Sequence, residues 1–330
     1  MISKTIVPVA LAVLFLSGAQ LFGQSGVQQQ APVAGSATQG SATQGSVAQG
    51  SSTREANPAM GSVNHTNWNK LLGKYVDKNG GVNYAGLKAN PQDSQVLDNY
   101  ITQLSSASLT KPATRENQMA YWINAYNAVT VKAILNVYPT TSIRNHTSET
   151  GGFNIWKNYP LTVGGRSFSL EDIEHKVLRP MGDPRVHFAI VCASEGCPRL
   201  LNQAYVGQTL NQQLNVNSKH FFSLPQNFQY DANNRSFKLS AIMQWFATDF
   251  GRDQASQLNT ISQFLPTPEA QAAARSNSVS VSHLEYSWKL NEQPKKTMSG
   301  SGMKASQGSG TQQGSGTQQG SGTQQGSGNR

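Results

Sequence analysis

Cysteine is scarce in this sequence: only Cys192 and Cys197 occur among 330 residues. Two cysteines exclude the framework of several disulfides that stabilises small secreted scaffolds. Combined with a histidine, the pair does not reproduce the spacing of a standard zinc knuckle, so we predict no metal site. No motif indicates a cofactor, and none is predicted.

Charged residues are also few, at 13% of the chain. The 26 lysines and arginines outnumber the 17 acidic residues and give a formal net charge of +9. Three of the cations, Lys4, Lys304 and Arg330, lie outside the expected fold, and the others are scattered singly. A nucleic-acid-binding surface needs clustered cations, so nucleic acid is not an expected partner.

Long apolar runs are missing as well. The stretch Ile6–Leu16 follows a short positive start and is shorter than the roughly 20 residues of a membrane-spanning helix. Small residues up to Ala19 then match the positions that a signal peptidase reads. Residues 1–19 are therefore predicted to be a signal peptide, and the mature protein to be secreted or periplasmic without a stable membrane span.

Two further segments contain little apolar surface. Residues 20–61 are rich in Gly, Ser, Ala, Thr and Gln with a repeated GSATQ, and residues 293–330 repeat GSGTQQ. Such segments cannot bury enough apolar surface to offset the entropy lost on ordering, so both are predicted to be disordered tails. Residues 62–292 remain, which is the length of a single domain.

Within that domain, helical periodicity predominates. The longest predicted helix begins after Thr114, a good N-cap, and ends near Tyr138 because Pro139 follows. A shorter helix, capped by Ser169, carries Glu174. We therefore expect a long central helix surrounded by shorter ones.

Strand signals are fewer. Hairpins are predicted at residues 160–168, across two glycines, and at residues 228–239, across two asparagines. The apolar run Val186–Val191 and the alternating segment Leu284–Leu290 predict two more strands. Because the helices do not alternate regularly with these strands, the predicted fold class is α+β, with a small mixed or antiparallel sheet.

Several segments together resemble one known family, the domain-of-unknown-function 547 (DUF547) family. They occur in the family's order and cover nearly all of residues 62–292: GGVNYAGLKAN (residues 80–90), ENQMAYWINAYNAVTVKAIL (116–135), SLEDIEHKVLR (169–179), DPRVHFAIVCASEGCPRL (183–200) and YSWKLN (286–291). The resemblance implies a family membership but no activity, because the family is defined by sequence alone.

The fourth of these segments brings His187 close to both cysteines in sequence. Export favours a disulfide between Cys192 and Cys197. The alternatives are a reactive thiol at Cys192 with His187 as its base, a metal site, or inert core cysteines. On a regular strand His187 and Cys192 lie on opposite faces, so cooperation requires Cys192 to follow the end of the strand. His187 therefore needs a partner from another element, either Glu116 at the start of the long helix or Glu174 and His175 on the shorter one. Glu116 is the candidate that orients His187 or acts as an acid.

Polar residues on the long helix form a second candidate group. Asn124 and Asn127 lie near one face with Trp122 close by, although asparagine is a poor helix former. They are candidates for binding a ligand in a polar cleft, and the alternative is that they brace buried loops.

One analogy bears on the fold. A long helix followed by a strand with a histidine resembles papain-like and transglutaminase-like thiol enzymes. Those enzymes have their cysteine at the start of the helix, where this chain has Arg115 and Glu116.

Two functions follow from these residues. The first is a hydrolase or transferase acting on envelope amide or ester bonds, with Cys192 as nucleophile, His187 as base and Glu116 as orienter. The second is a binding module without turnover, braced by the disulfide, that holds an envelope or extracellular glycan or peptide. Whether the protein is an enzyme stays open at the level of sequence.

Overall fold

The computed structural model describes residues 57–147 and 154–294, all of which fall within one compact unit. The predicted signal peptide, most of the predicted linker and nearly all of the predicted tail lie outside the described residues. No helix in the described ranges is both long and apolar enough to span a bilayer.

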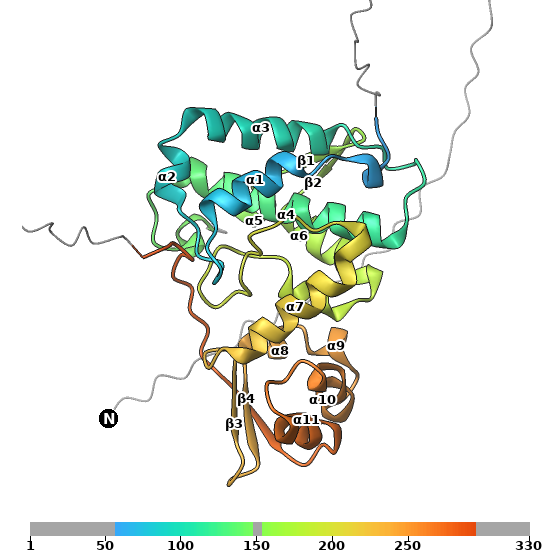
Figure 1. Ribbon diagram of the computed structural model, residues 1–330, viewed down its shortest axis with the longest axis vertical. Helices are drawn as coiled ribbons and strands as arrows, with labels where there is room; N and C mark the ends of the chain where they lie inside the picture. Colours follow the sequence, from blue (N-terminus) through green and yellow to red (C-terminus); the bar gives the residue numbers. More distant parts are fainter. Residues whose placement is uncertain (1–56, 148–153, 295–330) are drawn as a thin grey trace, which may run out of the picture. The chain divides into compact units, whose positions relative to one another are not determined.

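The described part of the chain is an α+β structure, as predicted (Figure 1). Its α-helices are α1 Thr66–Tyr75, α2 Tyr84–Lys88, α3 Pro91–Ser105, α4 Arg115–Val137, α5 Ile155–Asn158, α6 Leu170–Asp172, α7 Leu210–Ser223, α8 Ala241–Trp245, α9 Ala247–Phe250, α10 Gln254–Ser262 and α11 Pro268–Arg275.

Shorter helical turns connect these elements. The 3₁₀ turns are η1 Met60–Ser62, η2 Ile143–His146, η4 Arg179–Met181, η5 Pro184–Phe188 and η6 Gly207–Thr209, and η3 Ile173–Leu178 is a π-helix. The strands are β1 Leu161–Val163, β2 Arg166–Phe168, β3 Phe228–Asp231, β4 Ser236–Leu239 and β5 Ser280–His283.

Local sequence explains where the main helices begin. The Thr114 side chain accepts a hydrogen bond from the backbone N–H of Asn117 and caps α4. Ser169 and Asp172 form a capping box at α6, in which each side chain bonds the other residue's backbone N–H. Both predicted caps are therefore confirmed.

The long helix α4 lies within the larger of two hydrophobic clusters. Sixteen of its 23 residues are buried, because η1, α2, α3, α6, η3 and η6 pack against it. The stacked rings of Trp68 and Tyr100 add buried area from α1 and α3. Packing begins before residue 62, since Met60 is also buried.

A second hydrophobic cluster joins α7 to the elements that follow it, which lie below α7 in Figure 1. It contains the two buried aromatic residues Phe221 and Phe222 of α7 and Phe237 of β4. The sheet here is mixed: β4 pairs antiparallel with β3 and parallel with β5. A separate hairpin, β1 with β2, turns at the two glycines predicted from sequence.

Two predicted strands are wrong. The apolar run Val186–Val191 starts in the 3₁₀ turn η5 and continues without sheet pairing. An apolar run of this length indicates burial, but helical turns and strands bury such runs equally well. Leu284–Leu290 is likewise not a strand of the sheet, which ends at β5, although its alternating burial is largely kept.

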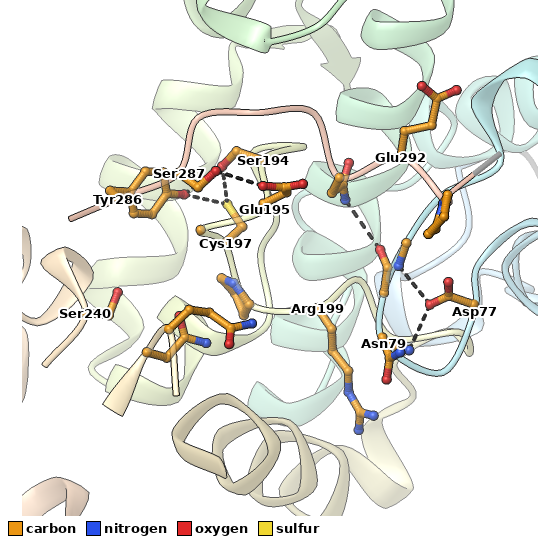
Figure 2. Close-up of a pocket in the computed structure, with 18 of the residues that line it drawn as sticks. Asp77, Asn79, Ser194, Glu195, Cys197, Arg199, Ser240, Tyr286, Ser287 and Glu292 are labelled. Carbon is orange, nitrogen blue, oxygen red and sulfur yellow. Dashed lines mark hydrogen bonds between the residues drawn. The ribbon is translucent and has the colours of Figure 1, made fainter. Parts of the chain in front are cut away.

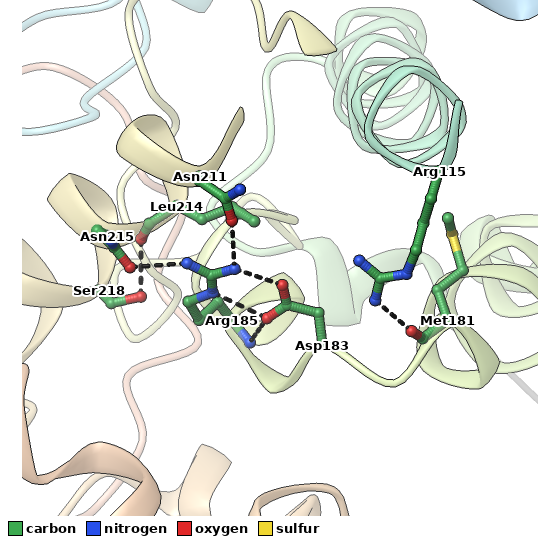
Figure 3. A network of polar contacts seen from close by, with 8 residues as sticks. All are labelled: Arg115, Met181, Asp183, Arg185, Asn211, Leu214, Asn215 and Ser218. Atoms are coloured by element: carbon green, nitrogen blue, oxygen red, sulfur yellow. Dashed lines mark hydrogen bonds and ion pairs between the residues drawn. The ribbon is translucent and has the colours of Figure 1, made fainter. Parts of the chain in front are cut away.

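The segment that carries His187 is held by an arginine network (Figure 3). The Arg185 guanidinium bonds both oxygens of Asp183 at 2.9 and 2.6 Å. It also donates to the side-chain oxygens of Asn215 and Asn211 on α7, at 2.7 and 2.9 Å. A bidentate arginine–carboxylate pair is geometrically demanding, so η5 has a defined orientation against α7.

Candidate functional site at the Cys192–Cys197 disulfide

Cys192 and Cys197 pair with each other as a disulfide. The hydroxyl of Tyr286 lies 3.2 Å from the Cys192 sulfur and 3.1 Å from the Cys197 sulfur. The Ser194 hydroxyl lies 2.8 Å from that of Tyr286. Figure 2 shows the hydroxyl groups of Tyr286 and Ser194 beside Cys197. The disulfide therefore lies in a polar, hydrogen-bonded setting.

The C-terminal segment, residues 284–294, supplies Tyr286. It pairs with the disulfide loop, residues 192–197. The backbone N–H of Glu195 donates to the carbonyl of Lys289 at 2.8 Å, and that of Gly196 donates to Ser287 at 2.9 Å. A Cβ atom on Gly196 would lie 2.8 Å from the ring of Tyr286. A glycine is needed there because the ring packs directly on the backbone.

A pocket of about 470 Å³ opens beside the disulfide (Figure 2). Carboxylates, amides and hydroxyls predominate in its lining, which also holds one arginine. The side chains that line it are Asp77, Asn79, Ser194, Glu195, Cys197, Pro198, Arg199, Gln226, Asn227, Ser240, Glu285, Tyr286, Ser287, Asn291, Glu292 and Pro294.

Aromatic rings gather next to this pocket. The ring of Tyr286 packs at a tilt against Trp288, at a ring distance of 4.6 Å, and against Trp245, at 4.8 Å. Trp245 is also nearly parallel to Trp288, at 5.8 Å and 22°. Trp156 meets the edge of Trp288 at 6.1 Å. We call these four rings the aromatic surface. Trp245 is 48% exposed, which is unusual for a large apolar side chain.

A cluster of titratable groups lies on the elements around Phe246, the neighbour of Trp245. Asp249 accepts two hydrogen bonds from Arg179, at 2.6 and 2.8 Å, and lies 2.7 Å from Nε2 of His187. The bonds from Arg179 hold the pKa of Asp249 down, at about 2. Burial lowers the pKa of His187 although Asp249 opposes that shift, so His187 is neutral at pH 7.

Glu174 belongs to the same cluster. Its Oε2 atom accepts a hydrogen bond from the Tyr126 hydroxyl of α4 at 3.3 Å. Burial raises the pKa of Glu174 to about 7, against the opposing effects of Tyr126 and Arg179. A carboxyl group with such a pKa can donate or accept a proton near neutral pH.

The predicted catalytic residues do not meet. In the described part of the chain, no hydrogen bond, ion pair or ring contact joins His187 to Cys192 or to Glu116. His187 pairs with Asp249 and stacks on Phe246 at 4.0 Å. Glu116 lies three turns before Asn127 on α4, about 16 Å along the helix axis.

The predicted ligand-binding residues lie in the interior. Asn124 is 1% exposed and exchanges two hydrogen bonds with the backbone of Tyr205, at 2.7 and 2.9 Å. Asn127 bonds the carbonyl of Ala189 and the N–H of Val191, both at 2.9 Å. Both amides therefore brace the loops that follow η5 and precede α7. This is the second of the two roles that the sequence allows for them.

Trp122 is also internal. It is 3% exposed and packs against Tyr121 at 5.1 Å and Phe168 at 4.9 Å. Its ring therefore offers little surface to a ligand in this structure. Within the described ranges, no group of three or more His, Cys, Asp or Glu side chains is arranged to hold a metal ion.

The central part of the chain matches one protein family. Residues 110–222 match a family model described as "Protein of unknown function, DUF547". Over these residues the chain is a DUF547 family protein. No curated protein and no solved structure gives a significant match to the chain. The analogy with papain-like and transglutaminase-like enzymes therefore stays a prediction.

The DUF547 region carries only part of the candidate site. It contains Tyr126, Glu174 and both cysteines, but it ends within α7. Trp245 and Asp249 lie beyond it, as does the C-terminal segment with Tyr286 and Trp288. In this DUF547 protein, the segments that complete the site thus come from outside the matched region.

Sequence reasoning missed the roles of Asp249 and Trp245 in this DUF547 protein. Glu174 was only one of several possible partners for His187. Asp249 lies in a short helix with no motif of its own. Trp245 fits a helical pattern of core residues as well as an exposed position. These two side chains stand out only in the folded structure, where residues from distant segments contact them.

Proposed function

We propose that this DUF547 protein binds a glycan chain on the aromatic surface beside the disulfide pocket. The observation that carries the proposal is the half-exposed Trp245, which stacks on Trp288 and packs at a tilt against Tyr286. Sugar rings have an apolar face of C–H groups and a rim of hydroxyls. Exposed indole rings complement the apolar face, because aromatic side chains offer large rigid area at low entropic cost.

The neighbouring pocket suits the hydroxyl rim. Its lining offers carboxylates, amides and hydroxyls that accept or donate hydrogen bonds. Several of these groups are already positioned: Glu195 accepts from Ser287 at 2.9 Å, and Arg199 donates to Asn217 at 2.7 Å. Ligand sites commonly combine an apolar contact area with a few placed polar groups.

The disulfide favours binding over a thiol mechanism. A cysteine nucleophile acts as a thiolate, whereas both sulfur atoms are paired here. The loop between the cysteines instead supplies Ser194 and Glu195 to the pocket wall. Since the sequence predicts export, the expected ligand is an envelope or extracellular glycan, and a peptide is the competing ligand class.

Calorimetric titration with β-linked hexasaccharides of glucose and of N-acetylglucosamine tests the proposal. These chains present flat, apolar ring faces. We expect binding of at least one chain in the micromolar to millimolar range. Trp245→Ala should weaken it at least tenfold, because the exposed indole provides the contact.

Val216→Ala is the matched control, since Val216 is 47% exposed on α7 and lies outside the aromatic surface. Its affinity should equal that of the wild type. Equal affinity of the Trp245→Ala and wild-type proteins would contradict the proposal, as would binding of peptides but not of either hexasaccharide.

A further inference from the structure

We infer that Glu174 is the proton donor of a hydrolytic site at the edge of the aromatic surface, acting on the glycan bound there. This inference rests on the proposed function and goes beyond it, because it makes the glycan a substrate. Three observations carry it: the hydrogen bonding of the carboxyl group, its place on a π-helix and its proximity to the aromatic surface.

The two carboxyl oxygens of Glu174 have different surroundings. Oε2 accepts from the Tyr126 hydroxyl, which orients the group. Oε1 has no hydrogen-bond partner among the described residues. It is also not one of the buried polar atoms without a partner there, which are Thr130 Oγ1 and His220 Nδ1. Glu174 is only half-buried, so one oxygen is anchored and the other can meet a ligand without giving up a protein hydrogen bond.

The backbone at Glu174 is exceptional in this fold. The capped helix α6 continues into the π-helix η3, on which Glu174 is the second residue. π-Helical turns are rare and are frequently found at functional sites. The wider turn changes the direction in which side chains leave the helix.

Neighbours of Glu174 contact Phe246, the residue next to Trp245 of the aromatic surface. His175 and Arg179, on the same run of helical turns, contact the ring of Phe246 at 6.3 and 5.2 Å. Phe246 directly follows Trp245. Burial raises the pKa of Tyr286, and the charge of Glu174 adds to that effect. The carboxyl group is thus within electrostatic range of a ring of the aromatic surface.

Charged and titratable groups face Glu174 from every neighbouring element. Tyr126 on α4 and Arg179 on η4 favour its ionised form, whereas Asp249 on α9 and Glu171 on α6 disfavour it. Burial exceeds all of these effects and raises the pKa of Glu174 to about 7. Asp249, with a pKa of about 2, stays ionised. Two carboxyl groups with such different pKa values are typical of acid–base chemistry.

The reaction is hydrolysis of a glycosidic bond. The bond between the anomeric carbon and the leaving-group oxygen breaks, and that oxygen receives the proton of Glu174. A water molecule adds to the anomeric carbon and releases one proton to solvent. Glu174 then regains a proton from solvent, so the net change is addition of one water across the bond.

The test measures binding and cleavage separately with the same two hexasaccharides. We expect the wild type to bind and to release shorter saccharides. Glu174→Gln keeps the size of the side chain and can still accept from Tyr126. It should bind within about twofold of the wild type but cleave 10²- to 10⁴-fold more slowly. Glu269→Gln, exposed on α11, should match the wild type in both assays.

The outcomes separate the two proposals. Binding without cleavage by the wild type overturns this inference and leaves the glycan-binding proposal intact. Equal cleavage by Glu174→Gln and wild type also overturns the inference. Absence of binding to both hexasaccharides overturns both.

A second variant tests the proton donor through pH. The rate should fall as pH rises through about 7, because Glu174 must be protonated. The Tyr126 hydrogen bond lowers the pKa of Glu174, so Tyr126→Phe should move this decline to higher pH. A decline at the same pH in both proteins contradicts the assignment of Glu174, since a purely structural role for Tyr126 would change the rate without moving its pH dependence.

Discussion

Two groups of polar side chains in this protein have different roles. Asn124 and Asn127 bond backbone groups of neighbouring loops and leave no free atom for a ligand. Glu174 keeps one carboxyl oxygen without a protein partner. The first group stabilises the fold, because unpaired buried backbone groups are costly. Glu174, in the second group, is the residue to which we assign proton donation.

The bracing role of Asn127 predicts a large loss of stability. Asn127→Ala leaves the carbonyl of Ala189 and the N–H of Val191 without partners, which should lower the free energy of unfolding by about 2–4 kcal/mol. Urea denaturation measures this change. Asn136→Ala, an exposed position on the same helix, should change it by less than about 1 kcal/mol. Similar losses in both variants would contradict the bracing role.

Glu174 also predicts how stability depends on pH. Its pKa rises from 4.5 to about 7 on folding, so the folded state holds the proton more tightly. The stabilising effect is fully present below pH 4.5 and is lost as pH rises through about 7. The loss amounts to at most about 3 kcal/mol.

Glu174→Gln lacks this titration. Urea denaturation at pH 5 and pH 8 should therefore show the wild type losing stability relative to Glu174→Gln at the higher pH. Glu269→Gln should keep a constant difference from the wild type. A constant difference for Glu174→Gln as well would show that the carboxyl group is not buried as described.

Among the elements, the disulfide loop and the C-terminal segment support each other. Four chain regions meet there: Leu290 donates to Thr141, Asn291 donates to Ala193, and Val82 donates to Asn291, all through backbone groups. The loop is thereby held on one side by the disulfide and on the other by the C-terminal segment. Ser194 and Glu195 take their positions in the pocket wall from both constraints.

The disulfide predicts a moderate stabilisation. Closing so short a loop is worth about 2 kcal/mol in the chain-entropy account, so Cys192→Ala/Cys197→Ala should lower the free energy of unfolding by about that amount and still fold. Mass spectrometry after thiol alkylation gives a direct check. The native protein should label at both cysteines only after reduction, and labelling of either without reduction would contradict the pairing.

Elements with local signals could be predicted from sequence, and those without them could not. The caps at Thr114 and Ser169 and the two hairpins depend on a few adjacent residues, which the sequence shows directly. The strand predicted at Val186–Val191 was wrong because burial alone does not select a strand. The strand predicted at Leu284–Leu290 was wrong because this segment pairs with the disulfide loop rather than with β4. Tertiary packing, which no local pattern shows, determines that pairing.

At the scale of the whole molecule, the candidate site is assembled from segments far apart in the sequence. Tyr126 and Glu174 lie in the DUF547 region, whereas Trp245, Asp249 and Tyr286 follow it. Tyr286 packs against both hydrophobic clusters and so lies where they meet. His187 and the cysteines were predictable because they share one segment. The aromatic surface was not, since no local pattern links its rings.

The measurement that tests glycan binding most directly is a titration followed by the indole N–H signals of the five tryptophans. Trp245 and Trp288 belong to the aromatic surface, whereas Trp68 and Trp122 are buried at 2% and 3% exposure and serve as internal controls. With the β-linked hexasaccharides, the signals of Trp245 and Trp288 should shift in a saturable way while those of Trp68 and Trp122 stay in place. Unchanged signals from Trp245 and Trp288 at saturating hexasaccharide would contradict the account.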